Sequence, residues 1–157
     1  MGKKSAKAEE KDDRKFVARN KKARFKFLVL ERFEAGLVLR GTEVKSLREG
    51  RAALSDSFGR FRGSELFLLN AHISTYDKAA YGNHEPTRPR KLLMRKRELK
   101  KLKAKVEERG HTLVALSLYF VRGLAKVELG LARGKRTHDR REDMKKRDAE
   151  REMRGRS

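Results

Sequence analysis

Hydrophobic residues recur at every second position where the apolar part of the chain begins. The residues with this period are Phe25, Phe27, Val29 and Phe33, and two leucines lie on the alternate face. Period two is the spacing of a β-strand, and two partly apolar faces indicate a strand buried in a sheet. The run is interrupted at Glu34-Ala35-Gly36 and resumes at Leu37-Val38-Leu39. This pattern predicts a tight hairpin.

The spacing then changes to that of a helix. Val44 and Leu47 lie three residues apart within the segment from Thr42 to Glu49. Thr42 suits the N-cap position, and Gly50 suits the left-handed residue that follows a helix. We expect a short helix of about two turns.

A second hairpin is predicted where the strand-like segments Phe58–Arg62 and Leu66–Ile73 flank Gly63-Ser64. Residues 74–91 have no periodicity and contain both prolines of the chain, so we expect a long loop there. From Arg95 to Arg109 the pattern is helical, and its narrow apolar stripe consists of Leu99, Leu102 and Val106.

A third hairpin joins Thr112–Val121 to Leu124–Ala132 through Arg122-Gly123. The chain therefore predicts six strands in three hairpins, with two helices between them. Closure removes the exposed edges of such a sheet. We expect a mainly β protein with helices (α+β): a small closed antiparallel six-stranded barrel with flanking helices.

The two ends differ from this core in composition. Residues 1–18 are charged without periodicity, and we expect a disordered extension before a domain at 19–132. From Arg133 onward the only large apolar residues are Met144 and Met153, so the basic tail at 133–157 cannot join the core. We expect the tail to be disordered when free.

The charge is concentrated outside the apolar strands. The 157 residues carry a formal net charge of +21. Residues 86–109 contribute eleven lysines and arginines against three carboxylates, residues 1–24 ten against four, and residues 133–157 eleven against six. Residues 25–85 and 110–132 each have a net charge of only +1. This distribution is typical of a protein that binds a polyanion, above all nucleic acid.

The helix predicted at 95–109 has eight basic residues and three acidic ones. Such a helix is either a solvated surface or a binding face whose repulsion an anionic partner relieves, and we favour the second interpretation. The basic run from Asn20 to Arg24 directly precedes the first strand and can likewise hold charge in a fixed place.

The sequence does not support several classes of function. The chain has no cysteine for disulfides or thiolate chemistry. The four histidines, at 72, 84, 111 and 138, do not have metal-ligand spacing, and no phosphate-loop motif is present. We expect no metal, no cofactor and no catalytic residue. The N-terminus has no signal-like apolar segment and no run is long enough to span a membrane, so we expect a cytoplasmic protein.

His138 lies between Arg136 and Arg140 in the basic tail. It is either a solvated tail residue or a ring that stacks on an unpaired base between phosphate-binding arginines. The residues alone leave both interpretations open.

Five blocks in order give the chain a specific resemblance. They are Phe33–Gly36 followed by Gly41–Arg48, Leu69–Ile73, Pro86–Arg88, Arg90–Leu93, and Val127–Lys135. From about Asn20 onward the chain resembles the SsrA-binding protein family, also called small protein B. The resemblance implies an oligonucleotide-binding-type (OB-like) barrel that binds the tRNA-like domain of transfer-messenger RNA (tmRNA). In that family the complex rescues stalled ribosomes by trans-translation.

The resemblance also implies partners and site residues. Expected partners are tmRNA, elongation factor Tu and the ribosome, including its large subunit, its 16S rRNA, and the A site and mRNA channel of its small subunit. The protein itself is expected to be a monomer. The residues implied to bind tmRNA are Asn20, Lys21, Lys22, Arg24, Glu34, Asn70, Arg88, Arg90, Lys91, Leu93 and Arg95. Those implied to bind the decoding centre and rRNA are Arg133, Lys135, Arg136, His138, Asp139, Arg140 and Arg141. The implied mRNA-channel residues are Lys145, Lys146, Arg147, Arg151 and Met153.

The resemblance favours the stacking interpretation of His138 and implies that the tail becomes helical on the ribosome. Two acid-to-base pairs, Asp143 with Arg147 and Glu150 with Arg154, support such a helix. The chain departs from the family pattern at Pro89 and Arg95. A structural ribonucleoprotein component, such as a ribosomal protein, is the alternative function, and a nuclease is the third.

Overall fold

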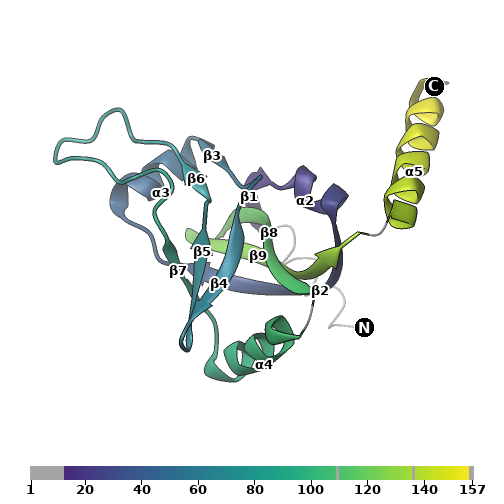
Figure 1. Cartoon of the computed structure of the whole chain (residues 1–157). Coiled ribbons are helices and arrows are strands. Elements are labelled where there is room, and N and C mark those ends of the chain that lie inside the picture. The colour runs from purple at the N-terminus through teal and green to yellow at the C-terminus, as the bar shows by residue number, and fades with distance from the viewer. Residues whose placement is uncertain (1–12, 109, 136, 156–157) are drawn as a thin grey trace, which may run out of the picture.

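One antiparallel sheet forms the body of the protein, with helices at its periphery (Figure 1). The computed structural model describes residues 13–108, 110–135 and 137–155. The elements are β1 (Arg14–Arg19), α2 (Lys21–Lys26), β2 (Phe27–Leu37), α3 (Gly41–Arg48), β3 (Ala52–Ala53), β4 (Phe58–Arg62), β5 (Glu65–Leu69), β6 (His72–Ile73), β7 (Arg90–Leu93), α4 (Lys96–Glu107), β8 (His111–Val121), β9 (Leu124–Gly134) and α5 (Thr137–Gly155).

Six strands close into a ring of hydrogen-bonded neighbours. The order in the sheet is β1-β8-β4-β5-β7-β2-β9, and β8 also pairs with β9. The strands β8, β4, β5, β7, β2 and β9 therefore form a continuous circuit, and β1 extends it along the free part of the β8 edge. The predicted closed six-stranded antiparallel sheet is confirmed.

The long β8–β9 hairpin has the predicted turn. Arg122 and Gly123 have φ values of 51° and 80°, and positive φ at both central residues is the geometry of a type I′ turn. The two strands stay paired from Val121↔Leu124 to His111↔Arg133. This hairpin is the longest local pairing in the ring and needs no distant segment to form.

Irregularities in the strand register bend the sheet toward closure. The pairing shifts between Val29 and Glu31 in β2 and between Ala115 and Ser117 in β8. Such bulges bend a strand and increase its twist. At Gly130 a β-carbon would lie 3.0 Å from Leu116 Cδ1 and 3.2 Å from Val29 Cγ1. A larger residue at this position would therefore require the side chains of Leu116 and Val29 to shift.

The predicted turn at Glu34-Ala35-Gly36 is wrong. β2 runs through these residues to Leu37, because β9 pairs with them as far as Gly36↔Lys126. The sixth ring position is taken by β7, which begins in the segment predicted as a loop and pairs with both β5 and β2. The number of strands in the ring is as expected, but one member differs.

The strand predicted at Leu66–Ile73 is two strands. β5 ends at Leu69, since Asn70 adopts a left-handed φ of 59°. The chain then turns away from the ring, and β6 pairs with β3 in a separate two-stranded sheet. The predicted helices at 42–49 and 95–109 are confirmed as α3 and α4.

The first strand lies in a segment for which no strand was expected. Residues 14–18, predicted to be disordered, belong to β1, which pairs with β8 from Arg14↔Val121 to Arg19↔Ser117. Phe16 packs against Tyr119 with ring centroids 5.4 Å apart, which gives this charged segment an apolar contact. Residues 1–12 lie outside the described residues.

The core fills the ring and continues beneath α3 and α4. Leu66, Leu92, Leu113 and Leu129 are fully buried between the strands. As predicted, α4 contributes Leu102 to the core, and Leu99 and Val106 pack beside it. The other faces of α4 are exposed and basic.

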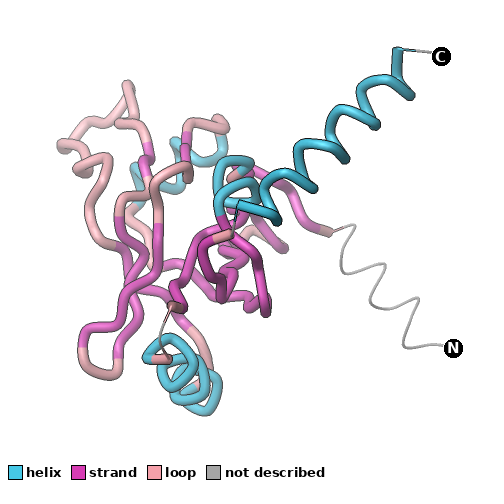
Figure 2. The backbone as a smooth tube through the Cα atoms, turned by 45° about the vertical axis from the view of Figure 1, so that its right-hand side comes forward, coloured by secondary structure: helices cyan, strands magenta, loops and turns pink. Residues whose placement is uncertain are grey.

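Figure 2 shows α5 standing away from the body, whereas the tail was expected to be disordered when free. Its nearest neighbour is α2, where the Arg147 guanidinium lies 5.1 Å from the Phe25 ring centroid. Its residues 141 and 144–153 are all exposed. The described side chains of the helix therefore add almost nothing to the core.

Candidate nucleic-acid interface

A hollow lies between β2, β9 and the β7–α4 junction. We call it the Glu34 hollow; its volume is about 760 Å³, and it is lined by Arg32, Phe33, Glu34, Gly36, Leu93, Met94, Arg95, Glu98 and Lys126. Three residues of the predicted tmRNA-binding set, Glu34, Leu93 and Arg95, meet here. They come together because Gly36 pairs with Leu93 across β2 and β7.

Glu34 is held in place by a hydrogen bond. The Tyr119 hydroxyl donates to Glu34 Oε2 over 2.5 Å. Burial, together with the bond to Glu34, raises the pKa of Tyr119, so the phenol stays protonated and keeps donating. No bond to Oε1 is found among the described residues, and an exposed carboxylate oxygen can accept from a base amino group or a ribose hydroxyl.

Charged and aromatic residues support Tyr119 and Glu34. Glu128 lies opposite Glu34 on β9 and forms ion pairs with Arg32 at 2.8 Å and Arg14 at 3.7 Å. The Arg14 guanidinium also lies 5.3 Å from the Tyr119 ring centroid. The local charge is thus mixed, and the neighbouring arginines partly compensate two adjacent carboxylates.

The sequence analysis missed this supporting group. Tyr119 and Glu128 lie on strands that were predicted correctly, but β1 was not predicted, so the partner on that edge of β8 was unknown. The available signal was the short apolar run Phe16-Val17-Ala18 within that charged N-terminal segment.

The Asn20 prediction needs correction. Its side chain is only 3% exposed; Nδ2 donates to Leu54 O and Ala115 O, and Oδ1 accepts from the Ala23 N–H. All its side-chain hydrogen-bonding groups are therefore used inside the protein. Asn20 caps α2 and fixes that helix on the ring, so it is a positioning residue.

The cations of α2 point outward. Lys21, Lys22 and Arg24 are exposed, and Lys22 Nζ lies 3.2 Å from Asp56 Oδ1. Asn20 therefore holds a short helix that presents positive charge, as the position of the basic run before the first strand suggested.

The Arg90 prediction also needs correction. Arg90 is fully buried: its Nε donates to Glu43 Oε2 at 2.5 Å, Nη1 to Ala71 O at 2.6 Å, and Nη2 to Pro86 O at 2.9 Å. A direct contact with RNA does not fit this burial. Arg90 instead fixes the end of the loop 74–89 to the body, which makes it a positioning residue.

Glu43 is the centre of this buried network. It accepts from Arg90, from half-buried Arg88 and from the Arg40 backbone N–H. Burial alone would raise the pKa of Glu43, but the bonds from Arg88, Arg40 and Arg90 outweigh it and hold the pKa below its usual value. α3 and the loop 74–89 are thereby connected through one charged cluster.

Asn70 and Lys91 are exposed but do not line the Glu34 hollow. Asn70 forms the left-handed turn after β5, and Lys91 Nζ lies 3.4 Å from Glu65 Oε1. The predicted tmRNA-binding residues therefore divide into α2, the Glu34 hollow, the buried cluster and these two separate positions.

The root of the tail is attached to α2. Lys135 Nζ donates to Arg24 O at 2.8 Å, and the Lys135 N–H donates to Lys26 O at 3.0 Å. Arg133 lies half-buried at the end of β9, opposite Leu28. The predicted tail residue Arg136 lies outside the described residues.

The remaining predicted tail residues fall on α5. Side-chain placement is not described for His138, Asp139 and Arg140. The exposed residues of the predicted set are Arg141, Lys145, Lys146, Arg147, Arg151 and Met153. Met153 is 75% exposed. Arg147 also contacts Phe25.

Neither a metal site nor a membrane span is found in the described part of the chain. Its residues contain no group of three or more His, Cys, Asp or Glu side chains placed to hold a metal ion. Among the same residues, no helix is both long enough and apolar enough to cross a membrane.

Known proteins resemble this chain over most of its length. The family model described as SmpB protein matches residues 17–156. The SsrA-binding protein of Geobacter sulfurreducens is 58% identical over 139 residues, which cover 88% of this chain and 91% of that protein. The SsrA-binding protein of Treponema denticola is 52% identical over 144 residues, covering 92% and 94%.

A solved structure has the same fold. It is described as "tmRNA-SmpB: a journey to the center of the bacterial ribosome", and it matches with a TM-score of 0.65 at 51% identity, over 79% of this chain and 91% of the other. The family match includes the ring, the Glu34 hollow and α5. The chain therefore belongs to the SmpB family of SsrA-binding proteins.

Proposed function

We propose that this protein is an RNA-binding adaptor that binds the tRNA-like domain of tmRNA and delivers it to stalled ribosomes for trans-translation. The observation that carries this function is the family match over residues 17–156, which spans both the ring and the tail. The protein acts by binding and positioning, without catalysis, and it works in the cytoplasm. Its partners are tmRNA, the ribosome and elongation factor Tu.

The tmRNA-docking surface consists of the Glu34 hollow and the outer face of α2. Lys21, Lys22 and Arg24 neutralise backbone phosphates, and each neutralised phosphate releases a counterion. In the hollow, Glu34 Oε1 accepts from a base or ribose, and exposed Leu93 packs on an apolar nucleotide face. Arg95 supplies a cation to the same nucleotide.

Asn20, Glu43 and Arg90 support this surface from inside. Asn20 fixes the direction of α2, while Arg90 and Glu43 fix the segment that leads into β7 and Leu93. The Arg88 guanidinium donates to Glu43, and Arg88 is half-buried, so it belongs to the same supporting cluster. Preorganised groups lower the entropy that binding must overcome.

The tail contacts the ribosome. α5 has nineteen residues, so it extends for about 28 Å. Its exposed cations neutralise rRNA phosphates near the decoding centre and along the mRNA channel, and the His138 ring stacks on an unpaired base. Lys135 and Arg147 set where the helix leaves the body.

Capture of RNA from cells tests the proposal. The full chain is expressed in its own host with an affinity tag and recovered under conditions that preserve ribonucleoproteins, and the bound RNA is sequenced. The expected result is one dominant tRNA-like species. Recovery of ribosomal RNA in ribosomal stoichiometry, without such a species, would instead identify a structural ribonucleoprotein component and overturn the proposal.

A further inference from the structure

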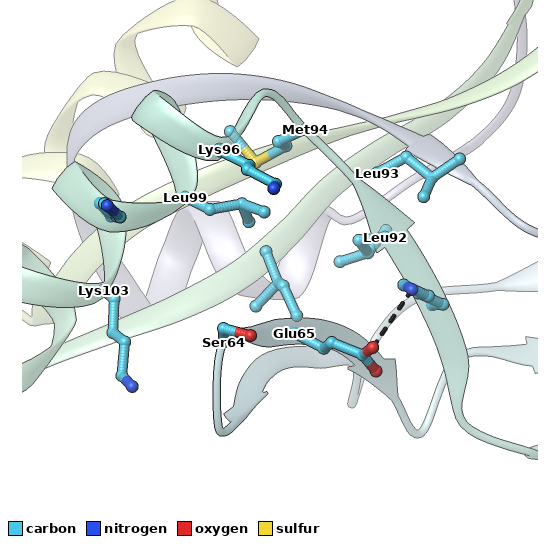
Figure 3. Close-up of a pocket in the computed structure, with 11 residues that line it drawn as sticks. Ser64, Glu65, Leu92, Leu93, Met94, Lys96, Leu99 and Lys103 are labelled. Atoms are coloured by element: carbon cyan, nitrogen blue, oxygen red, sulfur yellow. Dashed lines mark hydrogen bonds and ion pairs between the residues drawn. The ribbon is translucent and has the colours of Figure 1, made fainter.

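A second groove opens on the other side of β7 from the Glu34 hollow. It lies between α4 and the strands β5 and β7, has a volume of about 680 Å³, and is shown in Figure 3. We call it the α4 groove. The two sites adjoin, since Leu93 and Met94 line both, but β7 pairs with β5 on the side of the α4 groove and with β2 on the side of the hollow.

The floor of the α4 groove is aliphatic. It is formed by Leu66, Leu92, Leu93, Met94 and Leu99, and Leu92 and Leu99 face each other across it in Figure 3. Leu66 and Leu92 are fully buried, whereas Met94 and Leu99 are partly exposed and Leu93, which also lines the Glu34 hollow, is 52% exposed, so part of this apolar surface is in contact with water. Covering it would remove that contact.

The rim of the groove is cationic. Lys91, Lys96, Lys100 and Lys103 surround it, and Glu65 is the one carboxylate in the lining. Lys91 is paired with Glu65, and Lys103 Nζ donates to Gly63 O at 2.9 Å. Among the described residues, Lys96 and Lys100 have no carboxylate within ion-pair distance, although they lie one turn apart. Like charges at this spacing repel one another.

We propose that the α4 groove binds a short acidic segment of a partner protein, with aliphatic side chains on the floor and carboxylates against the lysines. The rim lysines complement carboxylates in charge. Lys96, Leu99, Lys100 and Lys103 occupy one face of α4 along about 10 Å, a length that two turns of a bound helix match.

Single-stranded RNA fits the α4 groove less well. RNA-binding sites for unpaired bases use aromatic side chains as stacking surfaces, and the groove has none in its lining. Its uncharged polar side chains are limited to Ser64. This inference goes beyond the proposed tmRNA function, which depends on the Glu34 hollow and α2.

The experiment uses the full chain and a labelled fourteen-residue helical peptide with leucines on one face and glutamates elsewhere. Binding is measured by fluorescence anisotropy, and the site is located by amide chemical-shift changes in NMR spectra. A second peptide keeps the glutamates but has serine in place of leucine. Because the protein is strongly basic, this peptide measures the purely electrostatic attraction.

Two double variants with the same charge change identify the rim. Lys96→Glu with Lys100→Glu reverses the groove lysines, whereas Arg97→Glu with Lys101→Glu reverses two exposed neighbours that do not line it. We expect about tenfold weaker binding of the leucine peptide by the first variant and less than about twofold by the second. Shift changes should fall on residues 64–66, 92–94 and 96–103.

Three outcomes would overturn the proposal: equal effects of the two variants, equal affinity for the serine peptide, or shift changes elsewhere on the protein. A fourth arm uses a short oligouridine RNA. If this RNA binds the α4 groove and displaces the leucine peptide, the groove is an RNA site. Binding of the tmRNA fragment is measured on the same samples, so a failure of this inference is distinguishable from a failure of the proposed function.

Discussion

Residues 86–109 and α5 both carry excess positive charge, but they hold it in different ways. In the first segment, a fully buried arginine is fixed by a fully buried glutamate, and α4 rests on the core through Leu102. In α5, the exposed cations lie on a helix whose packing contact in the described structure is that of Arg147 with Phe25.

This difference separates two kinds of mutational effect. A change in the buried network alters both folding and the shape of the docking surface, since the same bonds support both. A change on α5 alters binding to a partner and leaves the ring intact. The protein therefore combines a preorganised docking surface with a helix that is positioned mainly at its root.

Removal of α5 should give the largest functional loss. Truncation after Lys135 keeps the bonds from Lys135 to Arg24 and Lys26 and removes the exposed helix. We expect tagging of stalled products in a reconstituted translation system to be abolished, with affinity for the tmRNA tRNA-like fragment within about twofold. Normal tagging by the truncated protein would contradict this division of roles.

Loss of the buried guanidinium should give the largest change in stability. Arg90→Met keeps an unbranched side chain but removes the guanidinium, which leaves the buried Glu43 carboxylate without one partner. We expect the free energy of unfolding to fall by about 3–5 kcal/mol, measured by urea denaturation. Lys91→Met is the matched control, because Lys91 is exposed and its pair with Glu65 is solvated, and it should change stability by less than about 1 kcal/mol. Equal losses of unfolding free energy in the two variants would show that the buried network does not contribute specifically to stability.

Acid should weaken the same cluster. The folded-state pKa of Glu43 is held below its ordinary value of 4.5, so its ionised form is favoured in the native state. This contribution is fully present above the unfolded pKa and is lost as the pH falls through the folded pKa. The urea midpoint of the wild type should therefore decline below about pH 4.5, and Glu43→Gln should lack this part of the decline. Parallel pH profiles for the two proteins would refute the assignment.

The sequence was sufficient for the β4–β5 and β8–β9 hairpins and for α3 and α4, but not for α2 or for the long-range pairings. The Arg122-Gly123 turn and the leucine stripe of α4 are local signals, and both predictions are confirmed. Whether Glu34-Ala35-Gly36 turns or continues depends on β9, a partner about 90 residues away, so a local pattern could not decide it.

The candidate site was also predictable only in part, because the burial of its residues depends on long-range contacts. The family resemblance predicted a site containing Glu34, Leu93 and Arg95, and these residues meet in one hollow. Sequence could not distinguish exposed from buried members of a basic block: Arg88, Arg90 and Lys91 are close neighbours, yet Arg90 alone is fully buried. Burial follows from where Glu43 lies, which only the fold determines.

Glu34 should matter for RNA binding more than for folding. Glu34→Gln keeps an acceptor for the Tyr119 hydroxyl and removes the charge. We expect about tenfold weaker binding of the tmRNA fragment, as a hydrogen bond to a charged group is worth about 1.5–3 kcal/mol. The melting temperature should stay within about 2 °C of the wild type.

The control for Glu34 is Glu31→Gln on the same strand. Glu31 is exposed, lies 2.5 Å from Lys105 Nζ, and does not line the Glu34 hollow. The Glu31→Gln variant should bind the tmRNA fragment with nearly wild-type affinity. Equal weakening by the two substitutions would indicate a general effect of charge and not a specific contact at the hollow.

The smallest expected effect is at the root of α5. Arg147→Ala removes the guanidinium that lies over Phe25, and an exposed contact of this kind is worth about 0.5–1 kcal/mol. The Phe25 ring resonances in NMR spectra should therefore shift, and tagging should fall by no more than about fivefold, because the helix still leaves the body at Lys135. Lys146→Ala removes an equal charge from the neighbouring position and should leave the Phe25 resonances unchanged. If both variants reduce tagging equally with no change at Phe25, then α5 is oriented by its ribosomal partner alone, and its contact with α2 has no part in directing it.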